Sequence, residues 1–153
     1  MAQVSNPRKQ FNFSIQIAPA PINPFLAQKV ESPEITLETA EHGDTNHDIK
    51  TAGRVKFGNI NISKLQTTSG ADNYMFDWLY SCQDVILGGG LVPDDYKRVV
   101  TITELAEDGT SVLNTWICMG CFPVKINGQQ WDRQSSDNTV EQVELSVDRV
   151  EKV

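Results

Sequence analysis

Apolar and polar residues alternate along several short segments of this chain, and this alternation predicts strands with one buried and one solvent-facing side. Such segments span residues 11–17, 35–39 and 55–62. In the last of them the apolar positions change parity near Gly58, which indicates a bulge or kink. Three prolines, at positions 19, 21 and 24, are expected to end the first strand because proline cannot donate to a ladder.

The C-terminal part of the chain is also rich in predicted strands. Residues 98–105 and 112–119 flank an Asp108-Gly109 pair, which is a hairpin turn signal. Further strands are expected at 124–126 and at 143–147. With about seven strands and one helix, the pattern predicts a mainly β fold, an antiparallel sandwich or barrel with one flanking helix.

One segment has helical spacing instead. Asp72 is suited to cap it, and Gly88–Gly90 is expected to stop it. Its apolar residues follow at steps of three and four: Met75, Trp78, Leu79, Cys82, Val85 and Ile86. The first four of these are predicted to form the packing face, which a sheet or another subunit must cover.

Between two predicted strands lies a segment, residues 40–53, with almost no large apolar side chains. Long loops inside small domains are uncommon and are often functional. Residues 1–10 are polar and are expected to form a flexible arm, so the predicted organisation is this arm followed by a single domain over 11–153.

Composition narrows the classes of function. The chain has 153 residues, 20 acidic against 13 basic side chains and a net charge of −7, without a basic stripe for phosphate backbones or membrane surfaces. No apolar run is long enough for a membrane span, and the first residues contain no signal-peptide core. Three cysteines argue against a disulfide framework and for a reducing compartment.

The candidate chemical motifs each have a simpler structural interpretation. Cys118 and Cys121, with His42 and His47, could in principle hold zinc, but the two pairs are far apart and the cysteines lie in an apolar run. The triple glycine follows a helix and matches neither phosphate-loop pattern.

Acid pairs and aromatics are no more specific. The pairs Asp94-Asp95 and Glu107-Asp108 are expected to be solvated, since nothing in the sequence shows that they converge in a pocket. The tryptophans lack basic neighbours for nucleic-acid stacking, so core or subunit packing is the better interpretation. No catalytic, cofactor or metal site is predicted.

The order of these segments resembles the tail tube protein family of contractile-tailed bacteriophages, which includes the inner-tube proteins of contractile injection systems. The resemblance covers about residues 11–150 and is carried by three segments in order: Lys56-Phe57-Gly58-Asn59-Ile60, Pro123-Val124-Lys125 and Glu141-Gln142-Val143-Glu144-Leu145. The proline-rich stretch from Pro19 to Pro33 departs from the family's second strand.

The resemblance implies a structural virion protein that is not an enzyme. Six copies form a ring whose sheets join into one inner barrel, and rings stack into a tube that binds a sheath, a baseplate and a terminator. Genome DNA passes through the bore during ejection into the host, and the tail is assembled in the host cytoplasm without membrane insertion. In an injection system the cargo would be protein. A monomeric β binding domain is the alternative from a different class.

The resemblance also gives the polar segment a role, as an extension that reaches the next ring. The predicted inter-ring contacts are Glu41, His42, Asp44, His47, Asp48 and Lys50. A ring of six copies would carry 6 × (−7) = −42 charges. If part of this charge faced the bore, it would keep DNA from adhering to the wall.

Overall fold

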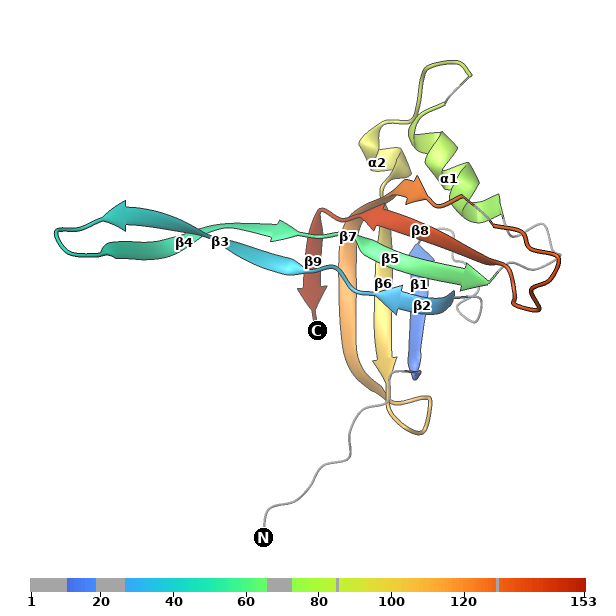
Figure 1. The fold of residues 1–153 in the computed structure, drawn as a ribbon, viewed down its shortest axis with the longest axis horizontal. Helices are drawn as coiled ribbons and strands as arrows, with labels where there is room; N and C mark the ends of the chain where they lie inside the picture. The colour runs from blue at the N-terminus through green and yellow to red at the C-terminus, as the bar shows by residue number, and fades with distance from the viewer. Residues whose placement is uncertain (1–10, 19–26, 66–72, 85, 129) are drawn as a thin grey trace, which may run out of the picture.

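The computed structural model describes residues 11–18, 27–65, 73–84, 86–128 and 130–153. The described part is mainly antiparallel β structure, as predicted, and it contains two short helices where one was expected (Figure 1). The elements are β1 (Phe13–Ala18), β2 (Ala27–Glu31), β3 (Ile35–Gly43), β4 (Asp48–Phe57), β5 (Ile60–Leu65), α1 (Tyr74–Cys82), α2 (Pro93–Tyr96), β6 (Arg98–Leu105), β7 (Val112–Ile126), β8 (Val140–Ser146) and β9 (Arg149–Lys152).

The body of the fold consists of two sheets that share the long strand β7. Its N-terminal part pairs with β6 and β9, and β6 pairs with β1; these strands form the first sheet. Its C-terminal part pairs with β8, and the order continues through β5 to β2; these strands form the second sheet. In Figure 1 the strands of the two sheets cross at a steep angle, as in an orthogonal sandwich.

Strand β7 passes from one sheet to the other at Gly120. Pairing with β6 reaches Cys121, and pairing with β8 begins at Phe122. Gly120 has φ of +67°, a left-handed conformation that residues with a Cβ rarely adopt, and the side chain of Asp148 occupies the space where a Cβ would lie. Asp148 is held there by the ammonium of Lys97, at 2.6 Å, and its N–H donates to the carbonyl of Met119 at 3.0 Å.

Replacing Gly120 with alanine is expected to destabilise the fold by about 1–3 kcal/mol, because the left-handed backbone becomes strained and Asp148 must move. Urea unfolding followed by circular dichroism measures this loss. Gly128→Ala is the matched control, since no atom lies within 4 Å of the added Cβ and its φ is not in the left-handed range. Equal stability of the two variants would contradict the role given to Gly120.

The core lies between the two sheets and is closed on one side by α1. Buried aliphatic residues from both sheets contact Met75 and Trp78 of the helix, both of which are almost fully buried. The Trp78 indole N–H donates to the carbonyl of Tyr96 at 2.7 Å, and the Arg98 guanidinium lies 4.8 Å from the indole ring centre. These contacts fix α1 and the start of β6 against each other.

The predicted helix is shorter in the structure than the apolar spacing indicates. It ends at Cys82, and Ile86 lies beyond it with 92% of its surface exposed, so Ile86 is not part of the packing stripe. Leu79 and Cys82 are half-buried, whereas Met75 and Trp78 are buried. Asp72 and Val85 lie outside the described residues, and Asn73 precedes the first helical turn.

Three other expectations about the strands need correction. Residues 112–119 and 124–126 are not separate strands but parts of the 15-residue strand β7, which bends without breaking. The polar segment 40–53 is not a loop: only residues 44–47 are outside the two strands of the β3–β4 hairpin. Strands β2 and β9 and helix α2 were not predicted.

One sequence expectation remains without a structural test. The predicted arm, residues 1–10, lies outside the described residues. Among the residues that the structure describes, no helix has the length and apolar character needed to cross a membrane.

Candidate assembly surfaces

The β3–β4 hairpin projects from the body of the fold (Figure 1). Its two strands pair with each other, and within the described chain neither pairs with a strand of the body. Isolated two-stranded ribbons are marginally stable in water. Both outer edges of this ribbon are therefore unpaired within the described chain.

The base of the hairpin carries exposed apolar side chains on one face. Ile35 lies opposite Phe57 and Leu37 lies opposite Val55 in the antiparallel register. Ile35, Leu37 and Val55 are each more than half exposed. Neighbouring apolar side chains with this exposure are typical of a surface that becomes buried on assembly.

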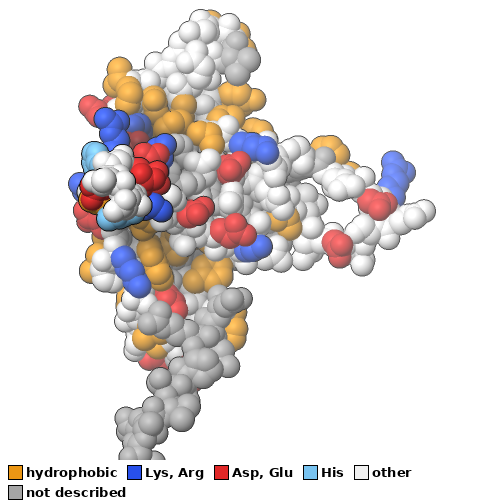
Figure 2. All heavy atoms as spheres, turned by 60° about the vertical axis from the view of Figure 1, so that its left-hand side comes forward, with side chains coloured by type: hydrophobic (Ala, Val, Ile, Leu, Met, Phe, Trp, Pro, Cys, Tyr) orange, Lys and Arg blue, Asp and Glu red, His pale blue; other side chains and the backbone are white. Residues whose placement is uncertain are grey.

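The outer half of the hairpin is polar and carries all six predicted inter-ring residues. Figure 2 presents this end toward the viewer, with acidic, basic and histidine side chains intermixed around it. Glu41 and Lys50 are register partners with an ion pair at 3.9 Å. The turn is closed by the Asp44 N–H, which donates to the His47 carbonyl at 2.9 Å. The structure thus brings these residues together at one exposed tip.

A second ion pair stiffens the middle of the hairpin. Lys56 and Glu38 contact each other at 2.5 Å, and this hydrogen bond and opposite charge raise the pKa of Lys56. Both side chains are well exposed, so the pair contributes little to stability. It links β3 to β4 beside the register shift between Leu37 and Thr39.

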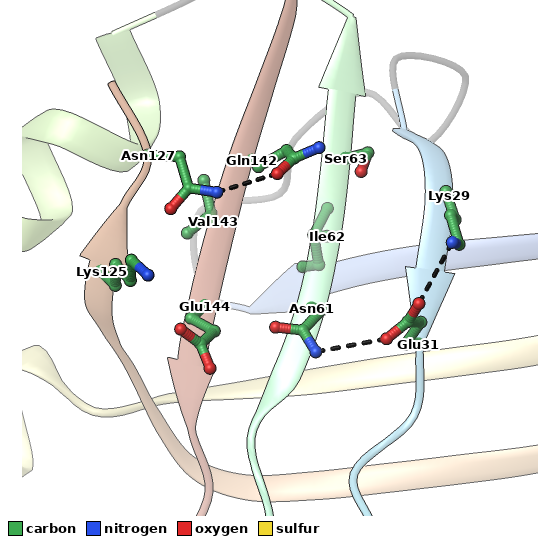
Figure 3. Close-up of a pocket in the computed structure, with 10 residues that line it drawn as sticks. All are labelled: Lys29, Glu31, Asn61, Ile62, Ser63, Lys125, Asn127, Gln142, Val143 and Glu144. Carbon is green, nitrogen blue, oxygen red and sulfur yellow. Dashed lines mark hydrogen bonds and ion pairs between the residues drawn. The ribbon is translucent and has the colours of Figure 1, made fainter. Parts of the chain in front are cut away.

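The outer face of the second sheet is the other distinctive surface, and we call it the polar face. It contains two lysines, two glutamates, three amides and a serine, in a shallow hollow of about 220 Å³ (Figure 3). Its members are Lys29, Glu31, Asn61, Ser63, Lys125, Asn127, Gln142 and Glu144. No large apolar side chain is exposed in this set, so the face is suited to permanent contact with water.

Hydrogen bonds connect these side chains across neighbouring strands. Glu31 accepts from Asn61 at 3.3 Å and pairs with Lys29 at 3.2 Å, and both contacts lower the pKa of Glu31. Asn127 donates to the Gln142 side chain at 2.8 Å (Figure 3). Five of the eight side chains on this face therefore bond to another member of it within a single copy.

The second sheet has two open edges in the described part of the chain. Strand β2 pairs with β5 on one side only, and residues 122–126 of β7 pair with β8 on one side only. Pro123 belongs to this second edge, where a missing N–H is tolerated. Unpaired edges expose backbone donors and acceptors and are templates for pairing with another chain.

Sequence reasoning did not find the polar face. Strand β2 lies in a stretch rich in prolines, so it was not predicted as a strand. In β5 and β8 the prediction used only the apolar positions that face the core, and the polar positions between them were not interpreted. The usable signal was the polar half of each alternation, Asn61-x-Ser63 and Gln142-x-Glu144, which is rich in amides and short of large apolar side chains.

The cysteine and acidic motifs considered as chemical sites lie in the core or in a turn of the fold. Cys118 and Cys121 are buried, and burial raises the pKa of their thiols to about 11 and about 12. In the described residues no group of three or more histidine, cysteine or acidic side chains could hold a metal ion. Asp108 accepts from Thr110, Ser111 and the Ser111 hydroxyl in the β6–β7 turn, which lowers the pKa of Asp108 to about 2.

A further exposed apolar tip follows α1. Ile86 and Leu87 are 92% and 85% exposed, and both backbone N–H groups donate to the Asp84 carboxylate. Gly88, with φ of +74°, completes this turn. The triple glycine thus belongs to a turn and not to a phosphate site.

The open edges of the second sheet and the projecting hairpin are typical of a structural domain that pairs with other copies of itself. Comparison with models of known protein families identifies the family: the model of the T4-like virus tail tube protein gp19 matches residues 9–151. The chain therefore belongs to this family, and it is a structural subunit of the inner tube of a contractile system. A search of curated protein sequences finds no match.

Solved structures with the same fold come from contractile injection particles. The anti-feeding prophage tube-terminating cap matches with a TM-score of 0.81 and 23% identity, over 100% of this chain and 95% of that chain. A chain of the sheath/tube terminator of an extracellular contractile injection system, PVC, matches with a TM-score of 0.80 and 24% identity, over 99% of both chains. A chain of the PVC sheath-tube complex matches with a TM-score of 0.78 and 24% identity, over 98% and 93%. These likenesses establish the tube-protein fold.

Proposed function

We propose that six copies of this chain form a ring and that rings stack head to tail into the inner tube of a contractile tail, through which genome DNA passes. The observation that carries this proposal is the pair of unpaired edges on the second sheet. A ring is a cyclic assembly in which each copy offers one surface to its neighbour and receives the other. Two different open edges on one sheet meet that requirement.

Strand direction supports closure by these edges. The second sheet contains four strands that alternate in direction: residues 122–126 of β7, then β8, β5 and β2. Because the number is even, β2 of one copy runs antiparallel to residues 122–126 of the next. The junction then continues the antiparallel pattern, and both edges of the second sheet become paired in the ring.

Stacking is assigned to the β3–β4 hairpin. Its apolar base and its charged tip both lie outside the body, where they can contact a neighbouring copy. Glu41, His42, Asp44, His47, Asp48 and Lys50 are proposed to contact the next ring. Such head-to-tail contacts between rings do not close, so they produce a filament.

Sheath, baseplate and terminator proteins are the proposed partners of the tube, in a particle assembled in the bacterial cytoplasm. The similar solved chains come from structures titled as a sheath-tube complex, a sheath/tube terminator and a baseplate, which supports this set of partners. An injection particle with protein cargo is the second candidate, favoured by the origin of these chains. Capsid and DNA-packaging genes beside the gene for this chain would favour the phage tail.

Self-assembly of the purified chain tests the central proposal. Rings or tubes are expected by negative-stain electron microscopy and by analytical ultracentrifugation as concentration rises. Ring closure is tested by Val124→Pro, which places a second proline in the open edge of β7; it is expected to abolish rings but to leave a folded monomer. A wild-type chain that stays a 17.0 kDa monomer at every concentration would contradict the proposal and favour a monomeric binding domain.

Shortening the hairpin is expected to separate ring formation from stacking. Thr39 and Ala52 are register partners, so an Asn-Gly turn can replace residues 40–51 and remove all six proposed contacts. Single rings without tubes are expected in micrographs. Glu107→Ala, in the exposed β6–β7 turn, is the control and should leave tubes intact. Long tubes from the shortened chain would exclude the hairpin tip from stacking.

A further inference from the structure

Ring closure by the second sheet makes its polar face the wall of the bore, and we propose that this wall is charge-balanced, so that it admits polymers of either charge. This inference rests on the ring closure proposed above and goes further, because it gives the charge of the surface that meets the cargo. Closure by the second sheet alone does not say which face points inward. The position of the rest of the molecule decides that point.

Among the described residues, the first sheet and α1 both lie on the core side of the second sheet. Buried side chains of β5 and β8 belong to the same core as the first sheet and α1. A barrel with four strands from each of six copies has a backbone diameter of about 37–50 Å, depending on strand tilt. A folded chain of this length has a radius of gyration of about 15 Å, so six bodies cannot fit inside that barrel.

The core side must therefore face outward, and the polar face must face the bore. The hollow in Figure 3 agrees with a concave inner surface. The composition agrees as well, because the face is polar and its three amides, Lys29 and Glu31 already form hydrogen bonds or an ion pair within it. A surface of this kind has little to gain from burial against a protein.

The charge of this wall differs from the charge of the whole chain. Lys29 and Lys125 balance Glu31 and Glu144, so the polar face has a net charge of 2 − 2 = 0. The net charge of the chain is −7, and it is consequently carried by other surfaces. Repulsion by acids, which the overall charge suggests, is then not the reason that cargo slides. Each cation instead lies beside an anion, which weakens its attraction for phosphates or carboxylates.

Accessibility in assembled tubes tests the orientation of the face. In a Cys82→Ala background, Ser63→Cys places a thiol on the polar face and Gln83→Cys places one after α1, on the proposed outside. The native Cys118 and Cys121 stay unreactive because burial raises the pKa of both thiols. The bulky probe is a maleimide on a folded protein of about 500 residues, whose radius of gyration of about 23 Å makes it wider than the bore.

Small maleimides are expected to label both variants in tubes, whereas the bulky probe labels only Gln83→Cys. Dissociated subunits should show no such difference. Equal bulky labelling of the two sites in intact tubes would overturn the inference while leaving the tube proposal standing. Failure to form tubes at all would contradict both the tube proposal and this inference.

Charge balance has its own test in the partitioning of small cationic and anionic dyes into wild-type tubes, where both are expected to enter equally. The variant Lys29→Gln/Lys125→Gln leaves two glutamates per copy and should enrich the cationic dye several-fold at low salt. That enrichment should fall as the Debye length shortens from about 30 Å at 0.01 M to about 10 Å at 0.1 M salt. Arg149→Gln/Lys152→Gln removes two cations from β9 of the first sheet and should not change partitioning. Selective exclusion of anions by the wild type would contradict the balance.

Discussion

Replacing Lys64 with methionine is expected to destabilise the folded subunit by about 3–5 kcal/mol. Lys64 and Glu141 lie directly opposite each other on β5 and β8, and they are only 0% and 1% exposed. Both point to the core side of the second sheet, beside Ile62 and Val143. Methionine fills similar volume but leaves the Glu141 carboxylate buried opposite an apolar side chain. Urea unfolding of the dissociated subunit, followed by tryptophan fluorescence, measures the loss.

Two controls isolate the effect of the buried charge. Lys125→Met makes the same change opposite Glu144 of the same strand, but on the exposed face, and it should alter stability by less than about 0.5 kcal/mol. The double variant Lys64→Met/Glu141→Leu removes both charges and should recover most of the loss. A Lys64→Met chain as stable as Lys125→Met would show that the buried charges do not depend on each other.

Truncating Trp78 to alanine is expected to lower the free energy of unfolding by about 3–5 kcal/mol, because it removes the largest fully buried side chain and leaves a cavity in the core. The indole also bonds to the Tyr96 carbonyl and lies against the Arg98 guanidinium, so its loss loosens α1 from the start of β6. Thermal and urea unfolding, with α1 exchange followed by hydrogen–deuterium mass spectrometry, would report both effects.

Trp78→Phe separates packing from hydrogen bonding. It keeps an aromatic ring but removes the N–H donor, so the Tyr96 carbonyl loses its partner and a smaller loss of about 1–3 kcal/mol is expected. Tyr80→Ala, on the exposed side of the same helix, should change stability by less than about 0.5 kcal/mol. Comparable losses from Trp78→Ala and Tyr80→Ala would contradict the assignment of Trp78 to the core.

Much of the fold could be predicted where local alternation coincides with one buried face. Strand β6 has the predicted bounds, with Val100 and Ile102 buried together, and Val143 and Leu145 share the core face of β8. The continuity of β7 could not be read locally, because Gly120 adopts a left-handed bend that only the contact with Asp148 explains. The helix was overextended because Ile86 keeps the helical spacing beyond the last helical residue.

The candidate site was less predictable than the fold, since assembly surfaces are defined by what a single copy leaves unpaired. The polar tip residues could be proposed because their segment lacks large apolar side chains. The pairing of these residues across the hairpin, such as Glu41 with Lys50, depends on the register of β3 and β4, which the sequence pattern did not predict. The two edges of the second sheet required the strand order, which places β2 beside β5 although a hairpin separates them in sequence.

The hairpin leaves the body after β2 and returns to it at β5, and these two strands are themselves neighbours. At its base the Gly58 N–H donates to the Glu34 carbonyl at 2.7 Å, so the two ends of the insertion are tied together. The intervening residues can then be lengthened, shortened or exchanged without shifting any pairing in the body. Changes in hairpin length at this junction could therefore alter the axial spacing of rings in the proposed tube without disturbing the fold of each subunit. The same junction is suited to the insertion of a foreign peptide, which would then be displayed at regular intervals along the tube.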